Sequence, residues 1–469
     1  MNRTRFLLIG LIVALLGGCT MAPQYKRPDS PVPANWPTGA AYQEAKPAVP
    51  ALTAEQLPWR EFITDARLQK VIETSLHNNR DIRLAALNVE RARALYGIQR
   101  AELLPVVQAV GIGSKERVPA DLASSGNATI NERYAVDLGV SSWELDFFGR
   151  IRSLKDRALE EYLATDQARR NTQILLVAAV ANAWFTLAAD SENLQLSRST
   201  LEAQVASYDL IRRRCDVGLS SELDLRRAQS QVDTARRNVA IYTQLAAQDE
   251  NALNLVVGAP VPQALLPSEL GGVTPPREIS PGMSSDVLLQ RPDVLAAEHR
   301  LKAANANIGA ARAAFFPRIS LTTAIGTASA ELSGLFKAGS ATWGFAPQIV
   351  IPIFDARTWS AYDVTKAERE ISVTQYEKTL QTAFREVADA LARRGTVEEQ
   401  LTAQQSLVEA NAETYRLSNA RYTHGIDNYL SVLDAQRSLY SAQQVLIDLR
   451  LARISNLVTM YGVLGGGDK

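Results

Sequence analysis

The amino-acid sequence predicts a mainly α-helical protein with a small β part and an internal duplication. The stretch at 81–109 is repeated at 293–321, and in both copies a helical pattern runs through a proline into an alternating pattern. Two further segments, 153–214 and 360–421, carry apolar residues every seven positions, which is the spacing of a coiled coil. Long helices beside two short strand pairs account for this fold class.

The two copies of the repeat match without a gap. The matched pairs include Asp81 and Asp293, Gly97 and Gly309, and Pro105 and Pro317. A long repeat that occurs twice indicates a duplicated domain, because a solenoid needs three or more short units. Proline cannot continue the hydrogen-bond ladder of a helix, so each copy is expected to change from helix to strand at its proline.

The composition excludes several classes of function. The 469 residues include 50 basic and 50 acidic side chains, and a nucleic-acid-binding protein would need a basic face. Cys19, Cys215 and the histidines His77, His299 and His424 are scattered, so we expect no metal site, disulfide framework or cofactor. The sequence contains no nucleophile–base pair and no glycine-rich phosphate loop, so we expect that the protein is not an enzyme.

Residues 1–18 are typical of a signal peptide. Arg3 and Arg5 precede an apolar segment at 6–16 that is too short to span a bilayer. The following Leu-Gly-Gly-Cys resembles a bacterial lipobox, in which Cys19 would be lipidated and become the first residue of the mature protein. The alternative is an ordinary signal peptide followed by a chance cysteine.

Residues 19–60 are expected to form a lipidated N-terminal arm. Eight prolines between Pro23 and Pro58 exclude helix and central strand. The arm is either extended along the folded body or a disordered linker, and the composition fits both. Thr20 follows the cysteine, and by resemblance to bacterial lipoproteins the absence of aspartate there favours a lipid-anchored location in the outer membrane.

Residues 61–260 are interpreted as the first structural repeat. Its expected elements are a helix at 65–102, a strand at 106–113, a loop at 116–132, a strand starting near Tyr134, a long helix at 153–214 and a helix at 222–256. Around Tyr134 apolar residues alternate with small or polar ones, as in a strand with lipid on one side and water on the other. The apolar run from Leu175 contains Asn182 and Thr186, so it fits a buried helix face better than a membrane span.

A proline- and glycine-rich linker at 261–283 separates the halves, 284–464 forms the second repeat, and 465–469 is a C-terminal tail. The second repeat is expected to contain a helix at 285–314, a strand at 319–325, a loop at 329–340, a strand at 343–351, a long helix at 360–421 and a last helix at 427–461. Four strands with a lipid-like face cannot close a barrel, because the smallest membrane barrels have about eight strands. We therefore expect several copies to share one barrel, continued by a tube of helices.

The layout resembles the outer membrane factors, the TolC-like channels, and within them the OprM-type lipoprotein branch. The residues that carry the resemblance are Cys19 in its lipobox, WELDFFGR at 143–150, RPD at 291–293, FFP at 315–317, PIFD at 352–355 and RYTHGIDNYLSVLDAQRSLYSAQ at 421–443. The resemblance implies a homotrimer with a twelve-stranded outer-membrane β-barrel and a periplasmic α-helical coiled-coil barrel. It also implies the passive exit duct of a tripartite multidrug efflux pump, with a periplasmic adaptor protein and an inner-membrane RND-type pump as partners.

In this family the helix-turn-helix tips narrow the periplasmic end of the channel. By resemblance, Asp434 belongs to an acidic ring at the constriction, where three carboxylates repel one another and attract cations. Arg421 and Tyr422 match residues that tie neighbouring tips together, and Asp224 matches an acidic partner in the first repeat. Arg437 lies one helical turn from Asp434 and is expected to pair with it. The alternative for each charge is a solvated position on a coiled-coil surface.

Two positions depart from the pattern of some relatives. Asp427 stands where they have a basic residue, and Ser431 stands where they have a second acid. The exact set of locking contacts therefore stays open. A periplasmic coiled-coil lipoprotein without a pore is the alternative function, but it does not explain two strand pairs with one apolar face.

Overall fold

The computed structural model describes residues 20–42, 57–280, 282 and 284–467. The signal peptide and the lipidation position, Cys19, lie outside the described residues. The chain divides into two compact units, and both draw on both halves of the sequence. The first unit comprises Met1–Pro28, Val89–Thr165 and Ala296–Tyr376, and the second comprises Asp29–Asn88, Asp166–Leu295 and Glu377–Lys469.

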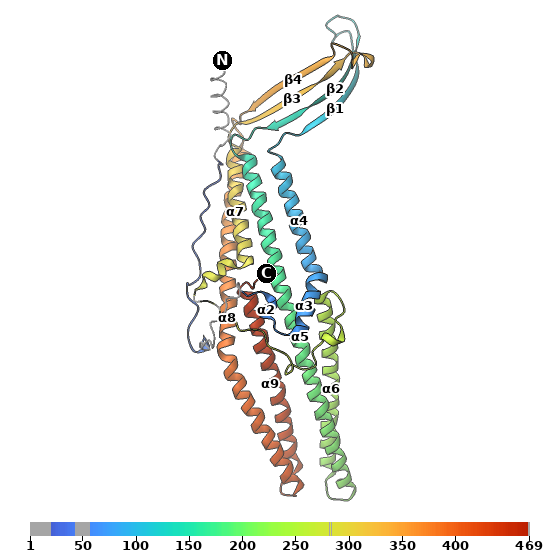
Figure 1. Ribbon diagram of the computed structural model, residues 1–469, viewed down its shortest axis with the longest axis vertical. Helices are drawn as coiled ribbons and strands as arrows, with labels where there is room; N and C mark the ends of the chain where they lie inside the picture. Colours follow the sequence, from blue (N-terminus) through green and yellow to red (C-terminus); the bar gives the residue numbers. More distant parts are fainter. Residues whose placement is uncertain (1–19, 43–56, 281, 283, 468–469) are drawn as a thin grey trace. The chain divides into compact units, whose positions relative to one another are not determined.

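The first unit contains one four-stranded antiparallel sheet in the order β1-β2-β3-β4 (Figure 1). The strands are β1 (Val107–Val118), β2 (Thr129–Glu144), β3 (Arg318–Ser329) and β4 (Ala341–Val350). The expected loop at 116–132 was too long, because the β1–β2 ladder continues to the pair Val118 and Thr129. Backbone pairing holds these polar strand ends together, and an ion pair between Lys115 and Glu132, 2.5 Å apart, adds to it.

The two faces of the sheet differ in chemistry. Paired residues share a face, and the face that carries Leu138, Ile325 and Trp343 is apolar. Its large side chains are exposed: Val107, Val136, Leu138, Ile325, Trp343, Phe345 and Ile349. The other face carries small and polar residues such as Asp137, Gly326 and Thr342. The described residues of this chain therefore leave one apolar sheet face uncovered.

Two long helices follow the strand pairs. They are α5 (Arg150–Asp216) and α8 (Ala356–Thr423), each a few residues longer at both ends than the heptad pattern predicted. Each is followed by a shorter helix, α6 (Glu222–Val257) or α9 (Tyr429–Val463). The side chain of Ser221 caps the start of α6 and that of Asn428 caps α9, and each accepts a hydrogen bond from a backbone N–H of the first turn.

The helix expected at 65–102 is two helices, α3 (Ala66–Asn78) and α4 (Arg80–Ala101). The prediction of one helix was wrong because Asn79 is extended and its side chain caps α4, accepting from the N–H groups of Asp81 and Ile82. The side-chain amide of Asn79 also donates to the carbonyl of Val256, which lies at the end of α6. Hydrophobic periodicity cannot predict this break between α3 and α4, because the apolar pattern continues through it.

The helix expected at 285–314 also divides. A 3₁₀ segment, η4 (Ser285–Gln290), precedes α7 (Pro292–Ala313). Arg291 between them is extended, as is favoured for a residue before proline, and Pro292 takes the first helical position. The buried guanidinium of Arg291 binds Asp293 at 2.7 Å, Glu386 at 2.9 Å and the carbonyl of Val463 at 2.6 Å. The arginine of the RPD motif thus joins α7, α8 and α9.

The core of the second unit forms around the middle of α5. Val180, Trp184 and Phe185 are fully buried there, and the Trp184 indole donates to the carbonyl of Leu265 at 3.0 Å. Among the described residues, α5 is the one helix that is long and apolar enough to cross a membrane. More than half of its most apolar stretch is buried in the protein. This burial confirms the interpretation of the Leu175 run as a core helix face.

Candidate gate and membrane-facing sheet

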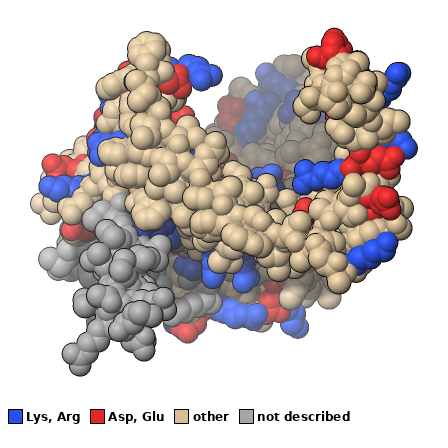
Figure 2. Space-filling model, turned by 90° about the horizontal axis from the view of Figure 1, so that it is seen from above, with Lys and Arg blue, Asp and Glu red and all other residues tan. Residues whose placement is uncertain are grey.

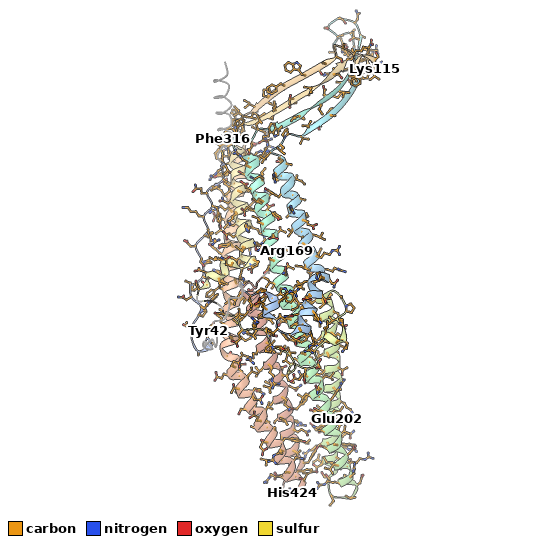
Figure 3. All side chains as sticks on the ribbon, in the orientation of Figure 1. Tyr42, Lys115, Arg169, Glu202, Phe316 and His424 are labelled. Atoms are coloured by element: carbon orange, nitrogen blue, oxygen red, sulfur yellow. The ribbon has the colours of Figure 1, made fainter. Side chains whose placement is uncertain are left out.

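Two of the predicted gate residues, Arg421 and Tyr422, lie at the turn between α8 and α9. Gly425 has a φ of 73°, and its lack of a side chain allows the chain to reverse there. The Arg421 guanidinium donates to both carboxylate oxygens of Asp427, at 2.6 and 3.1 Å. This pairing holds the pKa of Asp427 below its ordinary value. His424 is exposed at the same turn (Figure 3).

An aromatic cluster lies directly behind this turn. Tyr429 is buried, and its ring centre lies 5.3 Å from that of Tyr422. The guanidinium of Arg214, at the end of α5, lies 5.1 Å from the Tyr422 ring centre, within cation–π range. Burial raises the pKa of Tyr429, and the neighbouring tyrosines add to the shift. The predicted gate residue Tyr422 therefore connects the α8–α9 turn to the end of α5.

Asp224 has a local role at the start of α6. Its carboxylate accepts a hydrogen bond from the hydroxyl of Ser221 at 2.6 Å, and Arg227 lies 3.8 Å away. A carboxylate in the first helical turn also interacts favourably with the helix dipole. The structure thus gives Asp224 a capping role within one chain.

Asp434 lies on an exposed part of α9. Its side chain is 64% exposed, and one of its oxygens lies 4.0 Å from Arg437, the pairing that the helical spacing predicted. Arg437 is also bound across the bundle, where its Nε donates to Gln231 of α6 at 3.2 Å. A carboxylate this exposed is free to face a solvent-filled space.

The five predicted gate residues lie at three places in the structure. Arg421 and Tyr422 lie at the α8–α9 turn, Asp434 and Arg437 form a pair on α9, and Asp224 binds the hydroxyl of Ser221, the residue that caps α6. Two contributors were missed. Arg214 occupies the position in the first repeat that Arg421 occupies in the second, so the duplication could have indicated it. The role of Gln231 could not be predicted from the sequence, because it depends on how α6 packs against α9.

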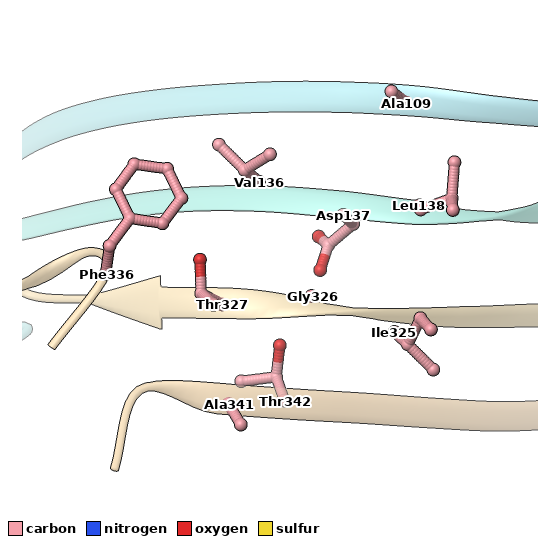
Figure 4. Close-up of a pocket in the computed structure, with 10 residues that line it drawn as sticks. All are labelled: Ala109, Val136, Asp137, Leu138, Ile325, Gly326, Thr327, Phe336, Ala341 and Thr342. Atoms are coloured by element: carbon pink, nitrogen blue, oxygen red, sulfur yellow. The ribbon is translucent and has the colours of Figure 1, made fainter. Parts of the chain in front are cut away.

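The sheet carries the second candidate functional surface. Figure 4 shows its middle, where Asp137 of β2 lies beside Gly326 of β3. A Cβ atom at Gly326 would overlap the backbone carbonyl of Val136 and the Cα of Asp137, which cannot move aside, so only glycine fits there. Figure 2 shows charges of both signs dispersed on the face seen from above, without a field of one sign. This dispersal fits the zero net charge of the chain.

The profile of the family described as Outer membrane efflux protein matches residues 71–259 and 283–466. The chain belongs to the outer membrane efflux protein family. It is 50% identical over 455 residues to the toluene efflux pump outer membrane protein TtgC of Pseudomonas putida, across 97% of this chain and 93% of that protein. The antibiotic efflux pump outer membrane protein ArpC of Pseudomonas putida has the same identity and coverage.

The structural comparison agrees with the sequence family. The open state of the MtrE outer membrane channel of Neisseria gonorrhoeae superposes with a TM-score of 0.86 at 37% identity, over 96% of this chain and 99% of that one. This outer membrane efflux protein therefore has the mainly helical fold with a small antiparallel sheet that the sequence predicted. The comparisons confirm the outer-membrane location and the efflux function, and they favour a channel over a coiled-coil scaffold without a pore.

Proposed function

We propose that three copies of this chain form one channel, with twelve strands in a shared barrel and the paired helices in a periplasmic tube. The observation that carries the proposal is the sheet, which has one exposed apolar face and two open edges, β1 and β4. An open strand edge in a bilayer leaves backbone groups without partners, so β4 of one copy must pair with β1 of the next. Three sheets of four strands exceed the smallest closed barrels of about eight.

The channel is the passive exit duct of a tripartite efflux pump. An inner-membrane pump of the RND type would supply the energy, and a periplasmic adaptor would join it to the helix tips. The relatives TtgC and ArpC are named for toluene and antibiotic efflux. Apolar solvents and antibiotics are therefore the cargo that we propose for this chain. The sheet face that carries small and polar residues such as Asp137, Gly326 and Thr342 would then line the water-filled interior of the barrel.

The periplasmic tips form the gate. Three copies of Asp434 would converge on the channel axis as an acidic ring, which repels anions and concentrates cations. The exposed side chain of Asp434 and its weak 4.0 Å pairing with Arg437 leave the carboxylate available for this role. Arg421, Tyr422 and Asp224 lie at the two helix turns, where opening would separate the tips.

Single-channel recording of the purified protein tests the pore and the gate together. Asp434→Ala should reduce cation selectivity, because it removes the acidic ring, and this would be seen as a reversal potential closer to zero in a salt gradient. The matched control is Asp233→Ala, which removes an acid of a similar Asp–Arg pair on α6. Unchanged selectivity in Asp434→Ala would contradict the acidic ring at the gate, and a protein without conductance would contradict the channel.

We also propose that Cys19 carries the lipid anchor of the mature protein. The lipobox supports this, and several acyl chains hold a membrane far better than one. The mass of the N-terminal tryptic peptide of the purified protein, with and without Cys19→Ser, measures the modification. An unmodified cysteine would contradict the anchor without affecting the channel.

A further inference from the structure

An open pocket of about 610 Å³ lies where the N-terminal arm begins. Thr20, Met21 and Ala22 form part of its lining. The rest of the lining comes from the end of α7, the link between α7 and β3, and the first turns of α8: Arg312, Phe315, Phe316, Trp359 and Tyr362. The pocket thus lies at the junction of helix and strand, where Phe316 marks the position in Figure 3.

The start of the arm is held firmly beside this pocket. The hydroxyl of Thr20 lies 3.1 Å from that of Ser153 on α5. The Asn305 side-chain amide donates to the carbonyl of Pro23 at 2.7 Å. A Cβ atom at Gly309 would overlap the backbone of Ala22, so this glycine lets the arm approach α7 closely. The first residues of the arm are therefore held by contacts with both α5 and α7.

The rest of the lining contains a cluster of aromatic rings. The ring centre of Phe315 lies 4.8 Å from that of Trp359 and 5.9 Å from that of Tyr362. The Trp359 side chain is 63% exposed although it takes part in this cluster. Arg312 lies across the Tyr362 ring and donates to the carbonyl of Met21 at 3.3 Å. The pocket therefore combines apolar ring surface with one cationic edge.

We infer that this aromatic pocket binds the proximal part of the lipid group attached to Cys19. The inference rests on the lipidation proposed above. Cys19 directly precedes Thr20, and consecutive Cα atoms are about 3.8 Å apart, so a lipid on its sulfur starts within reach of the pocket. Its acyl methylenes suit the exposed faces of Phe315 and Trp359. Tryptophan and tyrosine rings also favour the boundary between bilayer and water.

This arrangement gives the pocket a function in assembly. A lipid seated against α7 and α8 fixes the anchored end of the arm to the folded protein at the membrane boundary. The arm then starts from one defined point, and the acyl chains are directed along the aromatic cluster into the bilayer. The alternative occupant is a phospholipid of the surrounding membrane, which has similar acyl chemistry.

Photo-crosslinking distinguishes the two occupants. Cells expressing the full chain would be fed a fatty acid with a diazirine in its acyl chain, irradiated, and the purified protein digested with trypsin. We expect the lipidated peptide 19–26 to be joined to the peptide 358–366, which contains Trp359 and Tyr362. Peptide 358–366 joined only to phospholipid, or lipidated peptide 19–26 joined only to other parts of the protein, would overturn the inference.

Two variants sharpen this test. Trp359→Ala should reduce the yield of the 19–26 to 358–366 product several-fold, because it removes the exposed ring surface of the pocket. Trp343→Ala, on the apolar face of the sheet, is the matched control and should leave that yield unchanged. An unlipidated 19–26 peptide would overturn the inference together with the anchor, whereas single-channel conductance reports on the channel separately.

Discussion

Single residues determine how the tip of each helical hairpin is held. Arg421 was predicted to tie neighbouring tips together, and in one chain it is paired with Asp427 of the same turn. Asp427, which the resemblance marks as a departure from the pattern of some relatives, is therefore the residue that binds Arg421. An arginine with two hydrogen bonds to its own turn is less available to a neighbouring copy, so this tip is stabilised within the protomer.

The first prediction concerns this ion pair. Asp427→Asn should release Arg421 and increase the rate of amide hydrogen exchange at 421–427. The folded pKa of Asp427 lies below its ordinary value of 3.8, so the stabilisation exists above that pH and is lost as the pH falls further. The exchange rate of the wild type should therefore approach that of Asp427→Asn in acid. Asp216→Asn, at the exposed end of α5, is the control and should leave exchange at 421–427 unchanged.

The second prediction concerns Asp249, a half-buried acid on α6. Burial, and then a hydrogen bond with Asp190 of α5, raises the pKa of Asp249 from 3.8 to about 7. Asp448 of α9 also lies near Asp190, and Tyr242 of α6 lies near both. The folded protein holds the Asp249 proton more tightly than the unfolded chain. Its stabilising effect is therefore complete below pH 3.8 and is lost as the pH rises through about 7.

Thermal unfolding at several pH values measures this effect. Asp249→Asn should unfold about 2 °C higher than the wild type at pH 8 and at nearly the same temperature at pH 4. Asp233→Asn is the control, since this exposed acid lies on the same helix. An equal shift of Asp249→Asn at both pH values would contradict the proposed proton.

At the scale of elements, the arm is bound to α7 through one buried acid. The Glu298 carboxylate accepts from the Tyr25 hydroxyl at 3.1 Å and from Arg27 at 2.8 Å, and Lys302 lies 3.1 Å away. Burial alone would raise the pKa of Glu298, but the bonds from Arg27 and Lys302 outweigh it and lower the pKa. Removing a buried charge of this kind leaves its partners unpaired. The attachment of the arm, which carries Tyr25 and Arg27, therefore depends on Glu298.

The third prediction is that Glu298→Ala releases the start of the arm. Trypsin should then cleave the bond between Lys26 and Arg27 several-fold faster than in the wild type, because a protease needs an extended, unbound segment. Glu368→Ala is the control, because Glu368 is exposed and binds Asn307 rather than the arm. Equal cleavage rates in Glu298→Ala and the wild type would show that other contacts hold the arm.

At the scale of the whole molecule, the exposed apolar sheet face and the edge strands β1 and β4 support the proposal that several copies share one barrel. We expect the purified protein to migrate as a trimer in dodecyl sulfate without heating and as a monomer after boiling, because many backbone hydrogen bonds close a shared barrel. Gel mobility with and without heating measures this. A monomer under mild conditions, without conductance, would contradict the shared barrel.

The sequence by itself determined the duplication, the long helices, the strand pairs and the prolines between them. These features depend on local periodicity and on the backbone chemistry of proline, which any stretch of chain displays. The tertiary structure alone decided the break at Asn79, whose side chain caps α4 and reaches Val256, and the contact of Arg437 with Gln231. Such contacts join residues far apart in the chain, and their partners are known only once the helices are packed.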